Sequence, residues 1–227
     1  MATAPEILAR LRRQLAERFP TAPRTAARAL PTGLAAIDDA TGGLPLGAVT
    51  EIVSGAPSCG SQLLLEQLLG ATRATRTRVA LVDASDSFDP ASFPVDQLAH
   101  LVWVRCTAAT ALATADLLTR DANLGLVVLD LRRATERELR RTPSTFWYRL
   151  QRAVEPADLA LVVITPRATV PSAQLRFGLN TPHAAATLAL ERPALATALA
   201  PALQRQRLSL DQPGTLSLSN GPAAATA

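Results

Sequence analysis

The chain has 227 residues, 48% of them hydrophobic, which suits one globular domain with a sizeable core. Its net charge of +4 is compatible with nucleic acid, although 19 acidic residues moderate the positive field. No run approaches the roughly 20 apolar residues of a membrane span, and the two cysteines lack metal-ligand spacing, which excludes a membrane protein and a cysteine-based metal centre. We expect a soluble, cytoplasmic protein with reduced thiols and no bound metal.

Residues 1–20 predict an amphipathic helix, followed by a proline-rich linker over residues 21–31. Apolar residues recur at a helical period and arginines occupy the other faces. The helix either packs back on an edge of its own core or docks on a partner, and the sequence leaves both interpretations open. In the second case the anchors would be Ile7, Leu11, Leu15 and Phe19.

Residues 55–62 have the outline of a phosphate-binding loop without its chemistry. Such a loop needs two glycines, then a lysine for the phosphate oxygens and a hydroxyl for Mg²⁺. Gly55 and Gly60 have the required spacing, but Ser61 stands at the lysine position and Gln62 at the hydroxyl position. All 23 basic residues are arginines, so a chain-wide bias against lysine could explain the loss, yet no arginine stands at position 61. We therefore expect the loop without its cation.

The remaining pattern alternates buried strands with helices. Apolar runs predict strands over residues 49–53, 79–82, 101–104, 126–130 and 159–164, with helices over 62–69 and 110–122. Further strands are predicted over residues 185–190, 205–210 and 216–218, the last two forming a hairpin. The prediction is an α/β fold whose mostly parallel sheet is flanked by helices and ends in a C-terminal antiparallel hairpin. The core would span residues 32–220, and residues 221–227 would be a frayed tail.

The run from Thr32-Gly33 through Gly42-Gly43-Leu44-Pro45 to the loop resembles the ATPase core of the RecA recombinase family. The resemblance implies that Ser85 stands where the family has the glutamate that activates the attacking water. A serine hydroxyl holds its proton too tightly for that role, and adjacent strand-end positions such as Asp86 point to the opposite face. Asp130 ends an apolar strand in the manner of a Walker B carboxylate, and we interpret it as a structural remnant. The degenerate site then comprises Gly55, Gly60, Ser61, Gln62, Ser85 and Asp130, with no catalytic residue and no cofactor.

Residues 131–152 hold the densest cluster of arginines, with three aromatic residues among them. Such a cluster can contact phosphates and stack on bases, or it can be a solvated helix face with Glu136 and Glu138 pairing locally. Residues 168–180, which include Phe177, follow a strand where RecA relatives enter a DNA-binding loop. The candidate contacts to DNA or to a protein partner are Arg132, Arg133, Arg140, Arg141, Arg167 and Arg176.

Among RecA-like proteins, the length, the opening basic helix, the degenerate loop and the C-terminal hairpin resemble the ImuA family. The resemblance implies a non-catalytic adaptor of the bacterial mutasome that takes part in SOS-induced translesion DNA synthesis and mutagenesis. Its implied partners are ImuB, RecA and the error-prone polymerase. The arginine cluster adds the expectation of weak binding to single-stranded DNA. Two alternatives stay open: a DNA-binding modulator of RecA recombination, and an atypical ATPase whose cation comes from Arg73, Arg76 or Arg78.

Overall fold

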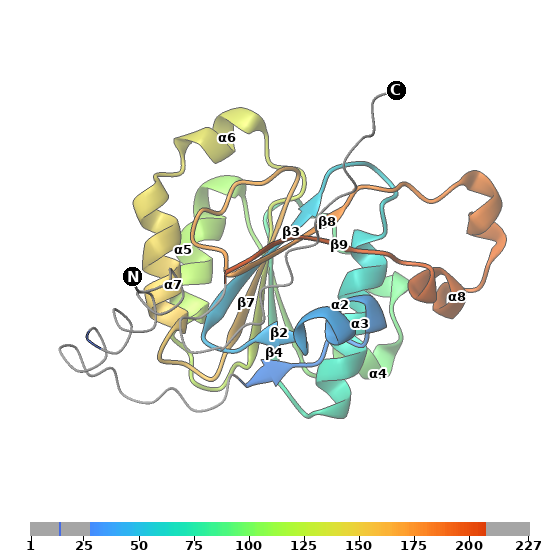
Figure 1. Cartoon of the computed structure of the whole chain (residues 1–227), viewed down its shortest axis with the longest axis horizontal. Helices are drawn as coiled ribbons and strands as arrows, with labels where there is room; N and C mark the ends of the chain where they lie inside the picture. The colour runs from blue at the N-terminus through green and yellow to red at the C-terminus, as the bar shows by residue number, and fades with distance from the viewer. Residues whose placement is uncertain (1–13, 15–27, 208–227) are drawn as a thin grey trace, which may run out of the picture.

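The computed structural model describes residue 14 and residues 28–207 (Figure 1). The predicted N-terminal helix, most of the predicted linker and the strand predicted over residues 216–218 lie outside the described residues. Within the described part, no helix is long and apolar enough to span a membrane.

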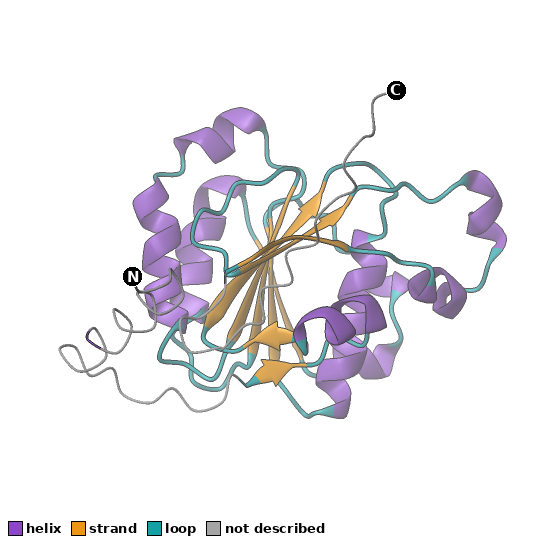
Figure 2. Ribbon diagram, viewed as in Figure 1, coloured by secondary structure: helices purple, strands orange, loops and turns teal. Residues whose placement is uncertain are grey.

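A seven-stranded sheet forms the centre of the molecule, and helices cover both of its faces (Figure 2). Every neighbouring pair is parallel except the last, β8 with β9. The strands in spatial order are β5 (Leu101–Arg105), β4 (Val79–Asp83), β6 (Leu126–Asp130), β7 (Ala160–Thr165), β3 (Ala48–Ser54), β8 (Leu175–Leu179) and β9 (Ala202–Gln206). The predicted α/β fold with a RecA-like core is therefore confirmed.

Each face of the sheet carries its own hydrophobic core. One core lies under α2 (Ala35–Thr41), α3 (Ser61–Ala74), α4 (Val95–Leu98) and α8 (Arg192–Thr197), which are grouped on one side in Figure 1. The other lies under α5 (Ala108–Leu118), α6 (Glu136–Arg141) and α7 (Ser144–Val154). Because β4, β6 and β7 are buried along their whole length and apolar up to their last residue, they form the rigid centre of both cores.

Three predictions of local structure are corrected. Ala29–Leu30, placed in the linker, form strand β1 and pair with β2 (Leu44–Pro45). Residues 185–190 are not a strand: Ala185–Ala189 form the 3₁₀ helix η2, and a further short 3₁₀ helix, η1, spans Pro90–Ser92. Without a neighbouring strand, the segment satisfies its groups locally, since the Thr187 hydroxyl donates to the carbonyl of Ala184. The unpredicted strand β8 buries Phe177 completely and thus removes it as a nucleic-acid contact.

Glu51 lies in the middle of β3, and its side chain is fully buried. Its carboxylate accepts hydrogen bonds from the backbone N–H of Thr169 (2.6 Å) and of Val170 (3.1 Å). The hydroxyl of Thr165 (2.9 Å) and the Arg176 guanidinium (Nε, 2.6 Å) complete its shell. These bonds tie the loop after β7 to the centre of the sheet. Arg176, predicted to contact DNA or a partner, is instead the counter-ion of this carboxylate, and its side chain is only 17% exposed.

We expect Arg176→Ala to lower the free energy of unfolding by about 3–5 kcal/mol, because it leaves Glu51 charged and unpaired in the sheet. Urea denaturation followed by circular dichroism measures the change. Arg167→Ala is the matched control, because its ion pair with Glu136 is solvent-exposed and should contribute less than about 1 kcal/mol. Equal effects of the two substitutions would contradict the assignment.

Candidate functional site

The predicted loop joins the end of β3 to the start of α3, as a phosphate-binding loop does. Gly60 is the N-cap of α3 and has φ of +87°, a conformation that favours glycine. The sheet register sets Asp83 opposite Asp130, and the loop after β3 lies at this same carboxyl edge. The ends of parallel strands thus bring the predicted degenerate site together.

Arg132 fills the centre of this site. Its Nε lies 2.9 and 2.8 Å from the two carboxylate oxygens of Asp130, and its Nη2 also donates to the same carboxylate. Its other terminal nitrogen, Nη1, donates to the hydroxyl of Ser61 at 2.8 Å. Asp130 is fully buried and Arg132 is 11% exposed, so this is an internal ion pair. A cation is present at the site, but it comes from the chain after β6 and is already neutralised by Asp130.

The Gln62 side chain, at the position of the metal-binding hydroxyl, is held by the loop after β4. Its Nε2 donates to the carbonyl of Ser87 at 2.8 Å. The Ser87 hydroxyl reaches Asp130 at 3.4 Å, so these contacts connect the loops after β4 and β6 to the first turn of α3. The other amide atom, Gln62 Oε1, is buried without a hydrogen-bond partner among the described residues.

Asp83 organises the loop after β4. Its carboxylate accepts hydrogen bonds from the backbone N–H of Ser85, Ser87 and Phe88, and from the indole of Trp103. Burial raises the pKa of Asp83, but these four bonds outweigh burial and hold the pKa below the ordinary aspartate value. The carboxylate is therefore a fixed structural anion.

Ser85 and Asp86 lie in the loop after β4, where contacts within the protein fix both residues. Ser85 lies in the turn that Asp83 fixes, and Asp86 has a positive φ of 49°. The exposed carboxylate of Asp86 forms a bidentate pair with Arg105 of the edge strand β5, at 2.7 and 2.6 Å. The Asp86 carboxylate is therefore neutralised by Arg105 and is not part of the cluster around Asp130.

The segment that follows β8, from His183 to Leu199, covers part of the loop formed by residues 55–62. If Gly60 carried a Cβ atom, that atom would lie 2.4 Å from Leu199 Cδ1 and 3.1 Å from His183 Nε2. The backbone N–H of His183 donates to the carbonyl of Ser58 in the loop. Arg192 fastens the segment by two hydrogen bonds, of 2.9 and 2.6 Å, to the buried Glu66 of α3. The chain itself thus occupies the space against Gly60.

These contacts do not fit a Mg²⁺–nucleotide complex. A carboxylate that is bound on both oxygens by a guanidinium does not offer a metal ligand, and Gln62 donates its amide to the protein. The arginines considered as substitutes lie elsewhere: Arg73 is in the last turn of α3, roughly 18 Å along the helix from the loop, and pairs with Asp96. Arg76 and Arg78 follow that same end of the helix.

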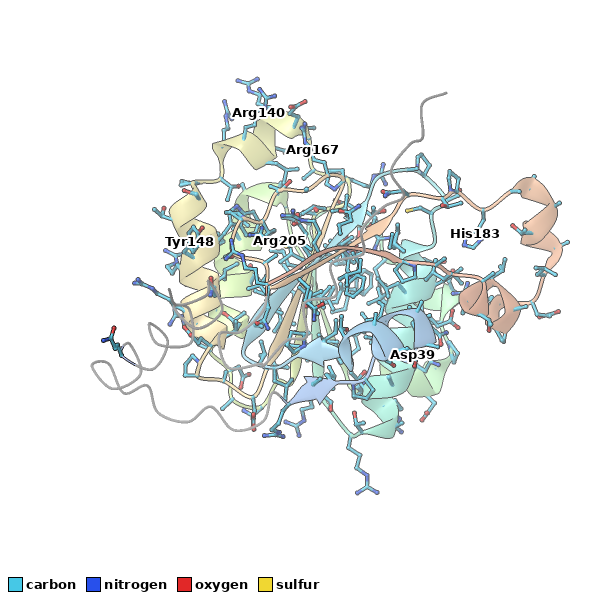
Figure 3. All side chains as sticks on the ribbon, viewed as in Figure 1. Asp39, Arg140, Tyr148, Arg167, His183 and Arg205 are labelled. Carbon is cyan, nitrogen blue, oxygen red and sulfur yellow. The ribbon has the colours of Figure 1, made fainter. Side chains whose placement is uncertain are left out.

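The six predicted DNA- or partner-binding arginines separate into two groups. Arg132 and Arg176 are committed to buried carboxylates. Arg140 and Arg167 share the carboxylate of Glu136, the first residue of α6, and Figure 3 shows the two arginines side by side. They line a cavity of about 520 Å³ that reaches down to the buried Trp147. Arg133 and Arg141 are exposed nearby.

The site residues that the sequence did not reveal are those that pair with, or pack against, other groups inside the protein. Glu51 carried a signal, because a single charge inside an apolar strand must be paired. Arg132 stands two residues after Asp130, but its proximity to Ser61 is a tertiary contact with no local pattern. His183 and Leu199 reach the loop from more than 120 residues away and left no signal at all.

Two comparisons with curated proteins give partial similarity to RecA. The chain is 38% identical over 106 residues to RecA of Clavibacter michiganensis subsp. michiganensis, an alignment covering 44% of this chain and 29% of that protein. It is 36% identical over 112 residues to RecA of Leifsonia xyli subsp. xyli, covering 47% and 31%. The matched part thus spans about three tenths of these relatives. No family model matches the chain. With the fold, this similarity supports a RecA-like protein.

We expect Arg132→Ala to reduce the free energy of unfolding by about 3–5 kcal/mol, because Asp130 is left buried without a counter-charge. Arg133→Ala, which removes an exposed neighbouring charge, should change it by no more than about 0.5 kcal/mol. The double variant Asp130→Asn/Arg132→Gln removes both charges and should recover part of the loss. Denaturant unfolding of the unmodified protein, Asp130→Asn, Arg132→Gln and the double variant completes the cycle, and additive effects would show that the two side chains do not interact.

Proposed function

We propose that this RecA-like chain is a non-catalytic adaptor in DNA repair. The observation that carries the proposal is the internal ion pair at the nucleotide site, where Arg132 binds both oxygens of Asp130 and the hydroxyl of Ser61. A RecA-like site must leave its Walker B carboxylate open to the metal and its loop open to phosphate. Here one arginine side chain occupies both positions.

Three separate contributions to ATP hydrolysis are replaced together. Ser61 supplies no phosphate-binding cation, Gln62 supplies no hydroxyl for Mg²⁺, and Ser85 supplies no base for the attacking water. A single loss could be compensated by another residue, whereas three losses at one site abolish the reaction. The covering segment at Gly60 supports the same conclusion by steric exclusion.

The finer proposal is that the adaptor belongs to the bacterial mutasome and acts in the cytoplasm during SOS-induced translesion synthesis. ImuB, RecA and the error-prone polymerase are its proposed partners, on the basis of the sequence resemblance to the ImuA family. The proposed contact is the predicted apolar stripe of the N-terminal segment, in which Leu11 and Leu15 are central. Single-stranded DNA is a second candidate ligand, favoured by the cavity that Arg140 and Arg167 line.

We expect calorimetry to detect no binding of Mg²⁺–ATP, with a dissociation constant no tighter than about 1 mM. A RecA protein under the same conditions is the positive control. The variant Ser61→Lys/Gln62→Thr restores the loop motif but should also fail to bind, because Arg132 still occupies Asp130 and Leu199 still covers Gly60. Micromolar binding with turnover by the unmodified protein would overturn the proposed function.

We expect Leu11→Asp/Leu15→Asp to abolish co-purification with ImuB or RecA, because it places two charges in the apolar stripe. Arg13→Ala/Glu17→Ala, which alters the opposite side of the predicted helix, is the matched control and should co-purify normally. Undiminished recovery of both partners by the aspartate variant would refute this contact.

A further inference from the structure

A groove of about 540 Å³ lies among α2, α3, α4 and α8, which share the face of the sheet opposite α7. Figure 1 shows these helices grouped on one side of the sheet. The α8 wall consists of Pro193, Ala196 and Thr197, and the α4 wall of Pro94 and Gln97. In both walls the residues are three or four positions apart, so each wall is one face of a helical turn. We call this feature the α2–α8 groove.

The α2–α8 groove has an apolar base and small residues on one wall. Leu34 and Leu199 line it and are only 4% and 6% exposed, so they form its base. Ala35 and Ala36, the first residues of α2, also line it and are exposed. Because their side chains are single methyl groups, the backbone of another element can come close to this wall. The groove can therefore bury apolar side chains of a partner.

The walls favour a helix over an extended strand as the occupant. A strand docks by main-chain hydrogen bonds to an exposed sheet edge, whereas a helix docks by packing its apolar face into a groove. The described residues that line the groove belong to helices and their ends, and none belongs to a strand. The backbone groups of helices are already bonded within each helix, so they offer a strand no ladder to join.

The two arginines of the helices around the groove are already neutralised. Arg192 of α8 donates two hydrogen bonds to Glu66 of α3, at 2.9 and 2.6 Å. Arg73 of α3 binds Asp96 of α4 through Nε and Nη2. Within their described bounds, α2, α3, α4 and α8 contain no further arginine or lysine. These helices therefore supply no uncompensated positive charge beside the groove.

Two carboxylates beside the groove have no such partner. Asp39 follows the two groove alanines of α2 by three and four positions, so it lies on the same face of that helix. Figure 3 shows Asp39 among the helices on this side of the sheet. Glu191 is the exposed N-cap residue of α8, two positions before Pro193. Within residues 28–207, neither carboxylate has a cation within salt-bridge distance. The groove is thus apolar inside and negatively charged at its rim.

We propose that the α2–α8 groove binds a basic amphipathic helix of a partner protein. The apolar side chains of that helix would pack on Leu34 and Leu199, and its lysine or arginine side chains would pair with Asp39 and Glu191. A negative rim repels the phosphates of nucleic acids and of anionic membranes, so charge complementarity selects a basic protein segment. The inference rests on the proposed adaptor function and deepens it, because an adaptor needs a second contact besides the N-terminal apolar stripe.

The test uses the full chain and a fluorescein-labelled peptide of about 14 residues, in which leucines recur at a helical period and arginines fill the other positions. Fluorescence anisotropy measures binding, and a peptide of the same composition in scrambled order reports non-specific charge attraction. Asp39→Asn/Glu191→Gln should weaken binding of the helical peptide at least about tenfold, which corresponds to about 1.4 kcal/mol. Glu155→Gln/Asp158→Asn removes the same charge after α7, away from the groove, and should bind like the unmodified protein.

A second variant tests the shape of the groove without changing its charge. Ala36→Gln places a larger polar side chain on the α2 wall, and position 36 is exposed, so the substitution is compatible with folding. It should weaken the helical peptide severalfold and leave the scrambled peptide unaffected. Circular dichroism checks that each variant folds.

Equal affinity of the unmodified protein for the two peptides, no binding of either, or unchanged binding by the Asp39/Glu191 variant would each overturn the inference. Residues 1–20 of this chain are also basic and partly apolar, so two further outcomes identify them as the occupant instead. One is a tighter binding of the peptide, by about tenfold or more, to the full-length Leu11→Asp/Leu15→Asp variant, which would show that the chain fills its own groove. The other is conversion of a dimer into a monomer by Asp39→Asn/Glu191→Gln in analytical ultracentrifugation, which would show that a second copy does so.

Calorimetry with Mg²⁺–ATP on the same samples separates failure of this inference from failure of the proposed function. The α2–α8 groove does not include Arg132 or Asp130, so a groove that binds no peptide leaves the result for the nucleotide site unchanged. Binding and turnover of Mg²⁺–ATP would overturn the proposed function whatever the groove binds.

Discussion

A buried carboxylate requires a positive partner, and the rest of the site depends on which partner Asp130 has. Arg132 of the same chain is a permanent counter-charge, so no metal ion is needed to stabilise Asp130 at the edge of the sheet. The guanidinium also reaches Ser61, which joins the loop after β6 to the first turn of α3. The architecture of a nucleotide site is thereby kept while its charge balance is satisfied internally.

The same constraint operates on β3, which β7 separates from β6. Glu51 would destabilise β3 if it stood alone, yet its four hydrogen bonds fix the loop after β7 and orient Arg176. The two internal ion pairs thus fix the loops that follow β6 and β7, which are neighbouring strands. What remains available to partners is the exposed charge farther out, on α6 and around the α2–α8 groove.

Local patterns identified the parallel strands and the loop, because a continuous apolar run between turn residues is a property of the nearby sequence. They failed at residues 185–190, where a run of mostly apolar residues was interpreted as a strand but no strand of the described residues pairs with it. They also misassigned Arg132 and Arg176 as surface contacts, since the composition of a basic cluster does not reveal which members face buried acids. Contacts such as Leu199 with Gly60 depend on the completed fold and have no signature in the nearby sequence.

The ion pair between Glu66 and Arg192, which holds the covering segment on α3, bears on how such a protein is regulated. ATPases of this architecture can change state when a nucleotide arrives or leaves, because the loop at the start of the helix senses it. If the chain is the proposed non-catalytic adaptor, its covered loop has no such input, and the outer surfaces keep one arrangement whatever the nucleotide level of the cell. Under the proposed function, the adaptor is permanently competent, and its activity is set by how many copies are made and how long each survives.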